Sequence, residues 1–217
     1  GIRAEYEFLQ GADPVPSLDL AGQSYRQVLE QAPDMALLWN NLGNIYYRMG
    51  EYQQSRGRPS DPSYRQAIDC CQKAVRLNST LVPAFNLMGA CWEGLGRAAV
   101  AGGGDPRPML ENAQSDYRRA LAANPKYIYA INNLGLSWLQ LARYAVLRNE
   151  DPKPLLRQSA SQFEEGLRIN ATFLDEVHYN YGDVRLLEAR LLIESGQDPS
   201  GKLEEARRHY GQALQIN

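Results

Sequence analysis

A repeat with a period of about 46 residues constrains the fold of this chain more strongly than any other feature of its sequence. Residues 39–47 read WNNLGNIYY, and related segments follow around residues 89, 135 and 182. Successive glycines of these segments lie 46, 46 and 47 residues apart, at Gly43, Gly89, Gly135 and Gly182. A second series in phase with the first holds an aromatic residue or a cysteine, at Tyr25, Cys71, Tyr117, Phe163 and Tyr210. A third series is the dipeptide Asp-Pro, which begins at Asp13, Asp61, Asp105, Asp151 and Asp198. Three series with one period predict a tandem array of one structural unit.

Each repeat is predicted to be a helical hairpin. Apolar residues recur at helical spacing, as in Ala21, Tyr25, Val28 and Leu29, and the Asp-Pro turn divides each repeat into a longer A helix and a shorter B helix. We predict an all-α fold, an α-solenoid of antiparallel hairpins with extended A helices that forms a single array over residues 1–217. Residues 1–10 read as the end of an A helix, so the array opens with a partial repeat. The predicted repeats are 1–33 (partial), 34–80, 81–126, 127–172 and 173–217.

The small residues are expected to explain how the two helices of a hairpin pack. A glycine inside a helix costs about 1 kcal/mol relative to alanine, so its recurrence needs compensation. A small residue follows each glycine 24 positions later on the B helix, at Ala67, Ala113, Ser159 and Ala206. We expect small residues to meet small residues within a hairpin, and the aromatic series to wedge between neighbouring hairpins. The aspartates before the prolines are expected to accept a backbone N–H at the start of each B helix.

Composition excludes several classes of protein. The chain has a net charge of −2 with both signs spread along it, which argues against nucleic-acid binding. No apolar run approaches the about 18 residues of a membrane span, so no membrane contact is expected. No signal peptide is recognised at residues 1–5. Cys70, Cys71 and Cys91 do not form a disulfide framework and are expected to be small buried hydrophobes, which favours a cytoplasmic location.

The repeat resembles a known family at particular residues. The pattern W-x2-L-G-x2-Y is met at Trp39, Leu42, Gly43 and Tyr46. The pattern A-x3-Y-x2-A is met twice, at Ala113, Tyr117 and Ala120 and at Ala206, Tyr210 and Ala213. A proline closes two of the repeats, at Pro33 and Pro125. At these residues the chain resembles the tetratricopeptide repeat, TPR. It departs from the family in length, because the usual repeat has about 34 residues. Long repeats with Asp-Pro-x-Pro turns look like the repeat regions that follow the catalytic domain of some bacterial serine/threonine protein kinases, although no kinase motif is present.

This resemblance implies a right-handed superhelix whose A helices line a concave groove for peptide or protein ligands. The groove positions it implies are Asn41, Asn44, Arg48, Asn86, Tyr129, Asn132, Asn133, Gln140, Glu176, Tyr179, Asn180 and Asp183. Asparagine carries both a donor and an acceptor and can pair with a peptide backbone. The alternative, that Asn41, Asn133 and Asn180 tie helices together, stays open. Some members of the family bind a C-terminal carboxylate through Lys or Arg at set positions of an A helix. This chain has no Lys or Arg at the corresponding positions, which argues against a ligand of that kind.

Catalytic, metal and cofactor sites are not predicted. His178 and His209 are the only histidines, and His178 stands in the place of Trp39 and Phe85, which favours a packed side chain. No Cys/His spacing suggests zinc. The predicted function is therefore a non-catalytic scaffold for protein–protein interaction, which could serve as the regulatory or recruiting region of a bacterial serine/threonine kinase. The alternative is self-assembly into a homo-oligomer through exposed solenoid ends, because the last B helix lacks a polar cap.

Overall fold

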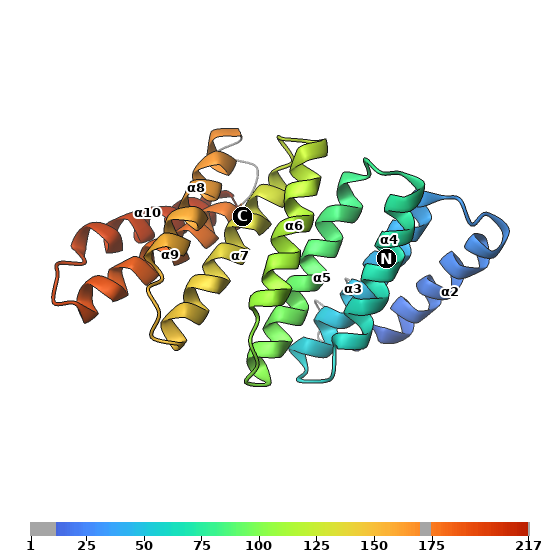
Figure 1. The fold of residues 1–217 in the computed structure, drawn as a ribbon, viewed down its shortest axis with the longest axis horizontal. Helices are drawn as coiled ribbons and strands as arrows, with labels where there is room; N and C mark the ends of the chain where they lie inside the picture. The colour runs from blue at the N-terminus through green and yellow to red at the C-terminus, as the bar shows by residue number, and fades with distance from the viewer. Residues whose placement is uncertain (1–11, 170–174, 217) are drawn as a thin grey trace. The chain divides into compact units, whose positions relative to one another are not determined.

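The protein is all-helical in the part that the structure, a computed structural model, describes, which is residues 12–169 and 175–216 (Figure 1). Helices over these residues are α2 (Val15–Gln31), α3 (Ala36–Ser55), α4 (Asp61–Leu77), α5 (Val82–Ala101), α6 (Arg107–Ala123), α7 (Ile128–Leu147), α8 (Lys153–Ile169), α9 (Asp175–Glu194) and α10 (Ser200–Ile216). They pack as consecutive antiparallel hairpins, which confirms the predicted fold class. The helix expected at residues 1–10 lies outside the described residues.

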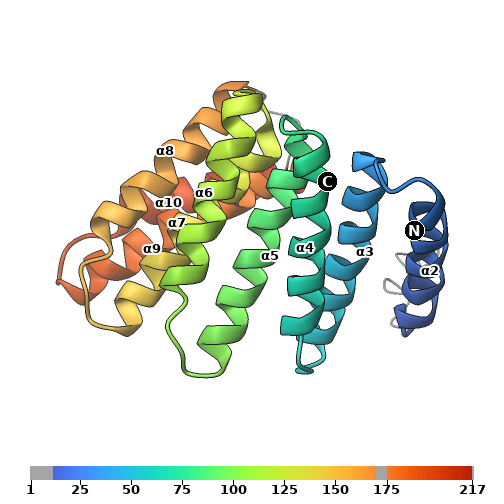
Figure 2. The ribbon, with the colours of Figure 1, turned by 45° about the vertical axis from the view of Figure 1, so that its right-hand side comes forward.

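The helices divide into two compact units, Gly1–Pro125 and Lys126–Asn217, here called the N-terminal and C-terminal units. In the N-terminal unit α2, α3, α4, α5 and α6 follow one another, and each packs against the next (Figure 2). The hairpins of the C-terminal unit are α7 with α8 and α9 with α10, and α8 also packs against α9. The boundary between the units lies one residue before the boundary predicted between two repeats. The single array over the whole chain stays a prediction.

The two kinds of helix have constant lengths. Each A helix (α3, α5, α7 and α9) has 20 residues, and each B helix (α2, α4, α6, α8 and α10) has 17. At 1.5 Å per residue these are rods of about 30 Å and about 26 Å. The predicted extension of the A helices is therefore present in all four full hairpins that the described residues contain.

Each A helix ends in the same left-handed turn. One residue of the hairpin loop has a positive φ: Gly57 at 65°, Gly103 at 76°, Asn149 at 55° and Gly196 at 70°. The next N–H in the chain donates back to a carbonyl of the A helix, for example from Glu150 to Ala145 at 2.8 Å. This 6→1 hydrogen bond is the mark of a Schellman-type helix end, which glycine and asparagine adopt at least cost. The loop that contains this turn has five residues in each of these hairpins.

The aspartates of the Asp-Pro series cap the B helices. The Oδ1 atoms of Asp13, Asp105, Asp151 and Asp198 each accept the backbone N–H two residues on, at 2.9–3.0 Å. These hydrogen bonds satisfy donors that a helix start leaves unpaired. At Asp198 the hydrogen bond with the Ser200 side chain, and then the one with the Ser200 backbone, lower the pKa of the carboxyl. The expected capping role is confirmed at these four positions.

A ring lies on the glycine of each of three A helices, which corrects part of the packing expectation. A Cβ atom at Gly135 would lie 2.8 Å from the Phe163 ring of the same hairpin, and Gly89 and Gly182 face Tyr117 and Tyr210 in the same way. Each of these three rings therefore packs on the A helix of its own hairpin, where the missing Cβ leaves room for it. The small residues do allow close approach, since the Ser159 hydroxyl donates to the Gly135 carbonyl at 2.8 Å. In the first full hairpin the Cys71 sulfur takes the place of the ring over Gly43.

A different tyrosine fills the space between neighbouring hairpins. The Tyr64 ring of α4 lies between Gly50 of α3 and Gly94 of α5, where added Cβ atoms would come within 2.7 Å and 2.3 Å of it. Tyr64 is fully buried, and both glycines are buried. In the N-terminal unit a wedge between hairpins is therefore made by Tyr64, which is outside the aromatic series. In the C-terminal unit Phe163 of that series does pack against the next hairpin, with its ring centroid 6.0 Å from that of Tyr181.

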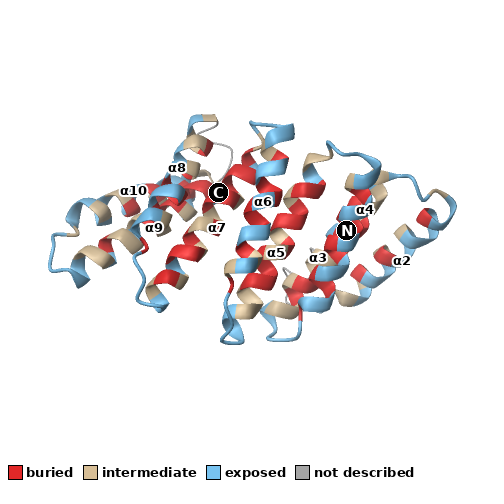
Figure 3. Cartoon of the chain, viewed as in Figure 1, coloured by how far each residue is buried: buried red, intermediate tan, exposed pale blue. Residues whose placement is uncertain are grey.

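The hydrophobic core follows the interfaces between helices (Figure 3). In the C-terminal unit a buried cluster joins α7, α8 and α9 through Leu139, Leu156, Phe163, Val177 and Val184. The faces turned away from neighbouring helices are exposed and carry most of the charged residues. Among the described residues, no helix is both long enough and apolar enough to cross a membrane.

The ring–glycine contact makes a testable prediction. Gly135→Ala should lower the free energy of unfolding by about 1–3 kcal/mol, because the new methyl group would force the buried Phe163 ring to move. Gly211→Ala is the matched control, since Gly211 also lies inside a helix but has open space around its Cα. That change should stabilise α10 by up to about 1 kcal/mol through helix propensity alone. Chemical denaturation of both variants measures the difference, and equal shifts would contradict the packing role of Gly135.

Candidate functional site

Two A-helix stripes form the candidate site in the C-terminal unit. On α7 the predicted residues Tyr129, Asn132, Asn133 and Gln140 follow helical spacing, and on α9 Glu176, Tyr179, Asn180 and Asp183 do the same. Helices α7 and α9 contact each other directly. Because residues three and four apart share one side of a helix, each set lies on a single stripe.

An asparagine pair joins the two stripes. Asn180 Nδ2 donates to Asn132 Oδ1 at 3.1 Å, and Asn132 Nδ2 lies 3.4 Å from Asn133 Oδ1. Asn132 is only 4% exposed, whereas Asn133 and Asn180 are half-buried. The hydrogen bond between Asn132 and Asn180 therefore ties α7 to α9, which is the helix-joining alternative for Asn180. Asn133 and Asn180 stay partly exposed on this surface.

An ion pair joins the stripes one turn further along. Arg143 of α7 binds Asp183 of α9 at 2.5 Å, and the Tyr210 hydroxyl of α10 donates to the same carboxylate at 2.7 Å. Burial, and then the hydrogen bond to Asp183, raises the pKa of Tyr210. Arg143 was missing from the predicted residues, although it stands three positions after Gln140 on the same stripe. That spacing is the signal that would have found it.

Two tyrosines expose large surfaces beside this frame. The exposed fractions are 42% for Tyr129 and 56% for Tyr179. Each ring rests against a second tyrosine, with centroids 5.5 Å apart for Tyr129 and Tyr127 and 5.6 Å apart for Tyr179 and Tyr210. We define the α7–α9 face by its exposed and half-exposed members: Tyr129, Asn133, Gln140, Arg143, Glu176, Tyr179, Asn180 and Asp183.

The predicted residues of the N-terminal unit lie on α3 and α5. Asn44 is exposed and accepts a hydrogen bond from Arg48 Nε at 3.1 Å. Asn41 and Asn86 are half-buried. These four side chains sit on A helices as expected, but the exposed tyrosines of the α7–α9 face have no counterpart at the positions predicted in this unit.

The N-terminal unit instead contains a partly buried polar network that sequence reasoning missed. The Tyr64 hydroxyl donates to Glu51 Oε1 at 2.5 Å, and Arg97 pairs with Glu51 at 2.5 Å and donates to Gln54 at 3.0 Å. Nearby, burial raises the pKa of the Glu93 carboxyl to about 8. These contacts join α3, α4 and α5, so the network stabilises the packing of two hairpins.

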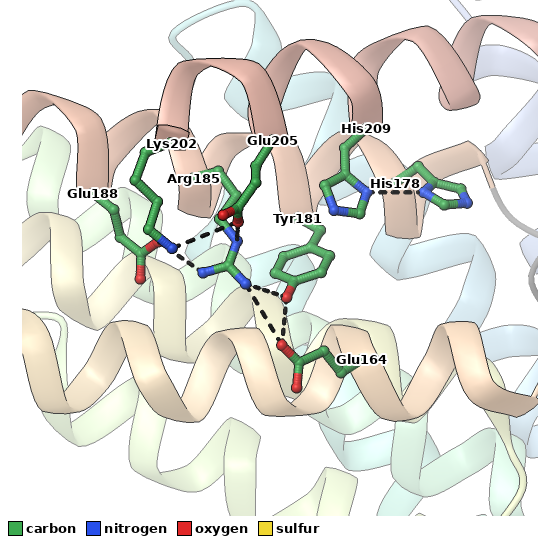
Figure 4. A network of polar contacts seen from close by, with 8 residues as sticks. All are labelled: Glu164, His178, Tyr181, Arg185, Glu188, Lys202, Glu205 and His209. Carbon is green, nitrogen blue, oxygen red and sulfur yellow. Dashed lines mark hydrogen bonds and ion pairs between the residues drawn. The ribbon is translucent and has the colours of Figure 1, made fainter. Parts of the chain in front are cut away.

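The only two histidines of the chain meet in the C-terminal unit. His178 Nδ1 of α9 and His209 Nδ1 of α10 are 3.1 Å apart, and the His209 ring packs at a tilt of 43° against the Tyr181 ring, with centroids 4.3 Å apart (Figure 4). Both side chains are buried, at 5% and 6% exposure, beside a cavity of about 490 Å³. Burial, followed by His178 and Arg208, lowers the pKa of His209 to about 4. Two neutral imidazoles can share one N–H···N hydrogen bond, which fits the packed role expected of His178.

Titratable side chains elsewhere do not converge on a metal site. No group of three or more His, Cys, Asp or Glu side chains in the described part of the chain is placed to hold a metal ion. Cys70, Cys71 and Cys91 are buried free thiols, as expected, and burial raises the pKa of Cys70 to about 11. A thiol with a raised pKa is a poor nucleophile at neutral pH.

Comparisons with known proteins agree with the helical-repeat architecture. The sequence model of the family described as "Tetratricopeptide repeat" matches residues 36–56, which are α3 and the residue after it. No curated protein sequence matches the chain. Solved structures with a similar fold include TTC0263, a thermophilic TPR protein of Thermus thermophilus (TM-score 0.64, 16% identity, covering 98% of this chain and 87% of that one). PilF of Pseudomonas aeruginosa is also similar, with a TM-score of 0.62 and 18% identity, and the match covers 99% of this chain and 73% of that one. YrrB, a TPR protein with an unusual peptide-binding site, has a TM-score of 0.53 and 18% identity, and the match covers 99% of this chain and 82% of that one.

The histidine pair makes stability depend on pH. The pKa of His209 is lowered in the folded state relative to its ordinary 6.5, so its contribution is complete above pH 6.5 and is lost as the pH falls toward 4. We expect the free energy of unfolding of the wild-type protein to fall more steeply over this range than that of His209→Phe, by about 1–3 kcal/mol in total. Carboxylates that titrate near pH 4 cancel in this difference. Identical pH profiles, measured by urea denaturation, would contradict the prediction.

Proposed function

We propose that this chain is a non-catalytic scaffold for protein–protein interaction and that the α7–α9 face contacts peptide or protein segments. One observation carries the proposal: Tyr129 and Tyr179 hold large exposed surfaces on a frame that Asn132–Asn180 and Arg143–Asp183 fix in place. Tyrosine provides flat contact area at low entropic cost and keeps a polar hydroxyl for hydrogen bonding.

The polar groups between the tyrosines suit a peptide backbone. Asn180 uses one N–H to bind Asn132, and its amide group has a second N–H and a carbonyl. Asn133 stands beside it on the same face and is half-exposed. Amide groups pair with backbone N–H and C=O groups of any sequence, so the tyrosine rings would supply most of the selectivity.

The comparisons support the coarse form of this proposal. The solved proteins of similar fold include two described as TPR proteins, one of them with a peptide-binding site. We extend the proposal to a role as the recruiting or regulatory region of a bacterial serine/threonine kinase. That extension rests only on the long repeats with Asp-Pro-x-Pro turns. A cytoplasmic location and the absence of nucleic-acid partners stay predictions from the sequence.

A displayed library of random peptides tests the α7–α9 face. Peptides selected on the wild-type chain are titrated by fluorescence anisotropy against wild type, Tyr129→Ala/Tyr179→Ala and the control Val28→Ala/Leu77→Ala. The control removes side chains of similar exposure, 47% and 46%, from B helices. We expect the tyrosine variant to bind at least about tenfold more weakly, because each ring loses its contact area. Equal peptide affinities of the two double variants would show that the binding surface lies elsewhere on the chain.

Self-assembly is a second candidate, and the exposure of α10 favours it. Leu203 of α10 stands in the repeat position of Leu156 of α8, which is fully buried in a hairpin junction that α9 helps to form. Leu203 is 42% exposed and Leu214 is 80% exposed. This uncovered helix face could pack against a second copy of the chain.

Light scattering coupled to gel filtration tests self-assembly. If α10 mediates it, the wild-type chain should show a mass above that of a monomer that rises with concentration, and Leu203→Glu/Leu214→Glu should restore the monomer. Both leucines are exposed in the folded chain, so the variant should retain its circular dichroism spectrum. A wild-type chain that stays monomeric at millimolar concentration would rule this candidate out.

A further inference from the structure

A second small cavity opens at the loop end of the C-terminal unit, away from the histidine pair. It has a volume of about 240 Å³ and lies where the start of α8, the end of α9 and the start of α10 meet. We call it the tip cavity. Pockets for drug-sized ligands usually measure about 300–1,000 Å³, so this one has the size for a single large side chain.

The inner wall of the tip cavity is aliphatic. Leu156 of α8 forms its floor and belongs to the buried core cluster, and Leu191 of α9 packs against the same cluster. Leu192 lies next to it and is half-buried. An apolar side chain that entered would replace water against these three leucines, which is favourable in proportion to the area buried.

The rim of the tip cavity carries two cations from one helix. Lys153 and Arg157 are exposed, line the cavity, and stand four residues apart, so they project from the same side of α8. Neither side chain has an ion-pair partner among the described residues. Other arginines of this unit do pair, for example Arg168 with Glu165 and Arg207 with Glu204.

The acidic residue of the wall, Glu188, is ion-paired with two cations. Its carboxylate lies 3.1 Å from Lys202 Nζ and 2.8 Å from Arg185 Nη1 (Figure 4). Arg185 and Lys202 also approach Glu205, at 2.7 Å and 3.5 Å. Because Arg185 and Lys202 are engaged by Glu188 and Glu205, Lys153 and Arg157 are the rim cations in the described part of the chain that remain available to a charged partner.

The equivalent junction of the N-terminal unit is closed by the chain's own side chains. Tyr64 of α4 stands in the repeat position of Leu156, and its hydroxyl reaches Glu51 and Gln54 near the end of α3. Arg97 of α5 completes that closure. Leu156 is shorter than tyrosine and has no hydroxyl, so the C-terminal unit lacks this seal and keeps an opening between α8 and α9.

We infer that the tip cavity is a docking site for an acidic peptide segment that inserts one leucine-sized or phenylalanine-sized side chain between Leu156, Leu191 and Leu192. Carboxylates on either side of the inserted residue would pair with Lys153 and Arg157. This site is separate from the α7–α9 face and does not depend on it. A partner that needs both an apolar anchor and flanking acids meets two independent requirements, which provides specificity.

The test uses a defined probe. A fluorescein-labelled peptide of alternating Asp and Glu around one central Phe is titrated with the full chain by fluorescence anisotropy at low salt. We expect saturable binding that weakens at least about tenfold when the central Phe is replaced by Ala, and at least about tenfold for the variant Lys153→Glu/Arg157→Glu. The change in the peptide keeps the test independent of the variant's folding.

Two more variants distinguish docking in the tip cavity from binding elsewhere on the chain. Arg168→Glu/Arg207→Glu makes the same change in net charge at exposed positions that do not line the tip cavity and should bind within about twofold of wild type. Tyr129→Ala/Tyr179→Ala should bind the probe like wild type. The inference fails if no saturable binding is seen, or if the Ala peptide binds the wild-type chain as tightly as the Phe peptide. It also fails if the two charge-reversed variants lose the same affinity for the Phe peptide, or if Tyr129→Ala/Tyr179→Ala no longer binds that peptide.

Discussion

An aromatic ring lying on a glycine is the contact on which this architecture depends. Phe163 on Gly135, Tyr117 on Gly89 and Tyr210 on Gly182 each place a large apolar surface where any Cβ would collide with it. The propensity lost by a glycine inside a helix is offset by burial of the ring, which is worth more. Because the contact recurs from hairpin to hairpin, it sets how closely the A and B helices approach in each. The first full hairpin shows that the ring itself can be replaced, since the Cys71 sulfur lies over Gly43 in its place.

The helix ends then decide where function can reside. Each A helix stops at a left-handed residue, and four of the B helices start under an aspartate cap, so the hairpin loops are short and well defined. Side chains that could contact a partner are then found in two kinds of place. The A helices present the α7–α9 face along one side, from their first turns onward, and the loop ends present junctions between hairpins. One of these junctions is sealed by Tyr64 and another is open above Leu156.

The sequence predicts the fold well because the fold is periodic, and it predicts the site less well because the site is not. Hairpins and close helix packing follow from glycines and aromatic positions that recur every 46 or 47 residues, and the aspartate caps follow from Asp-Pro dipeptides spaced 44 to 48 residues apart. The burial of Asn132 does not follow, since it depends on the partner Asn180, 48 residues away on another helix. Arg143 could have been found from its helical spacing. The meeting of His178 and His209 and the opening beside Leu156 depend on which side chains face each other across neighbouring helices, and a single sequence does not record that.

Tyr64 shows how hairpins of the N-terminal unit are joined. Its ring belongs to α4 but is held between glycines of α3 and α5, and its hydroxyl enters the same polar network as Glu51 and Arg97. Opening either hairpin alone would leave a cavity around the ring and strand a charge without its partner. The loss of one hairpin therefore removes support from the other. Helices α3, α4 and α5 should behave as one cooperative block in hydrogen exchange, with amides that become exposed together rather than helix by helix.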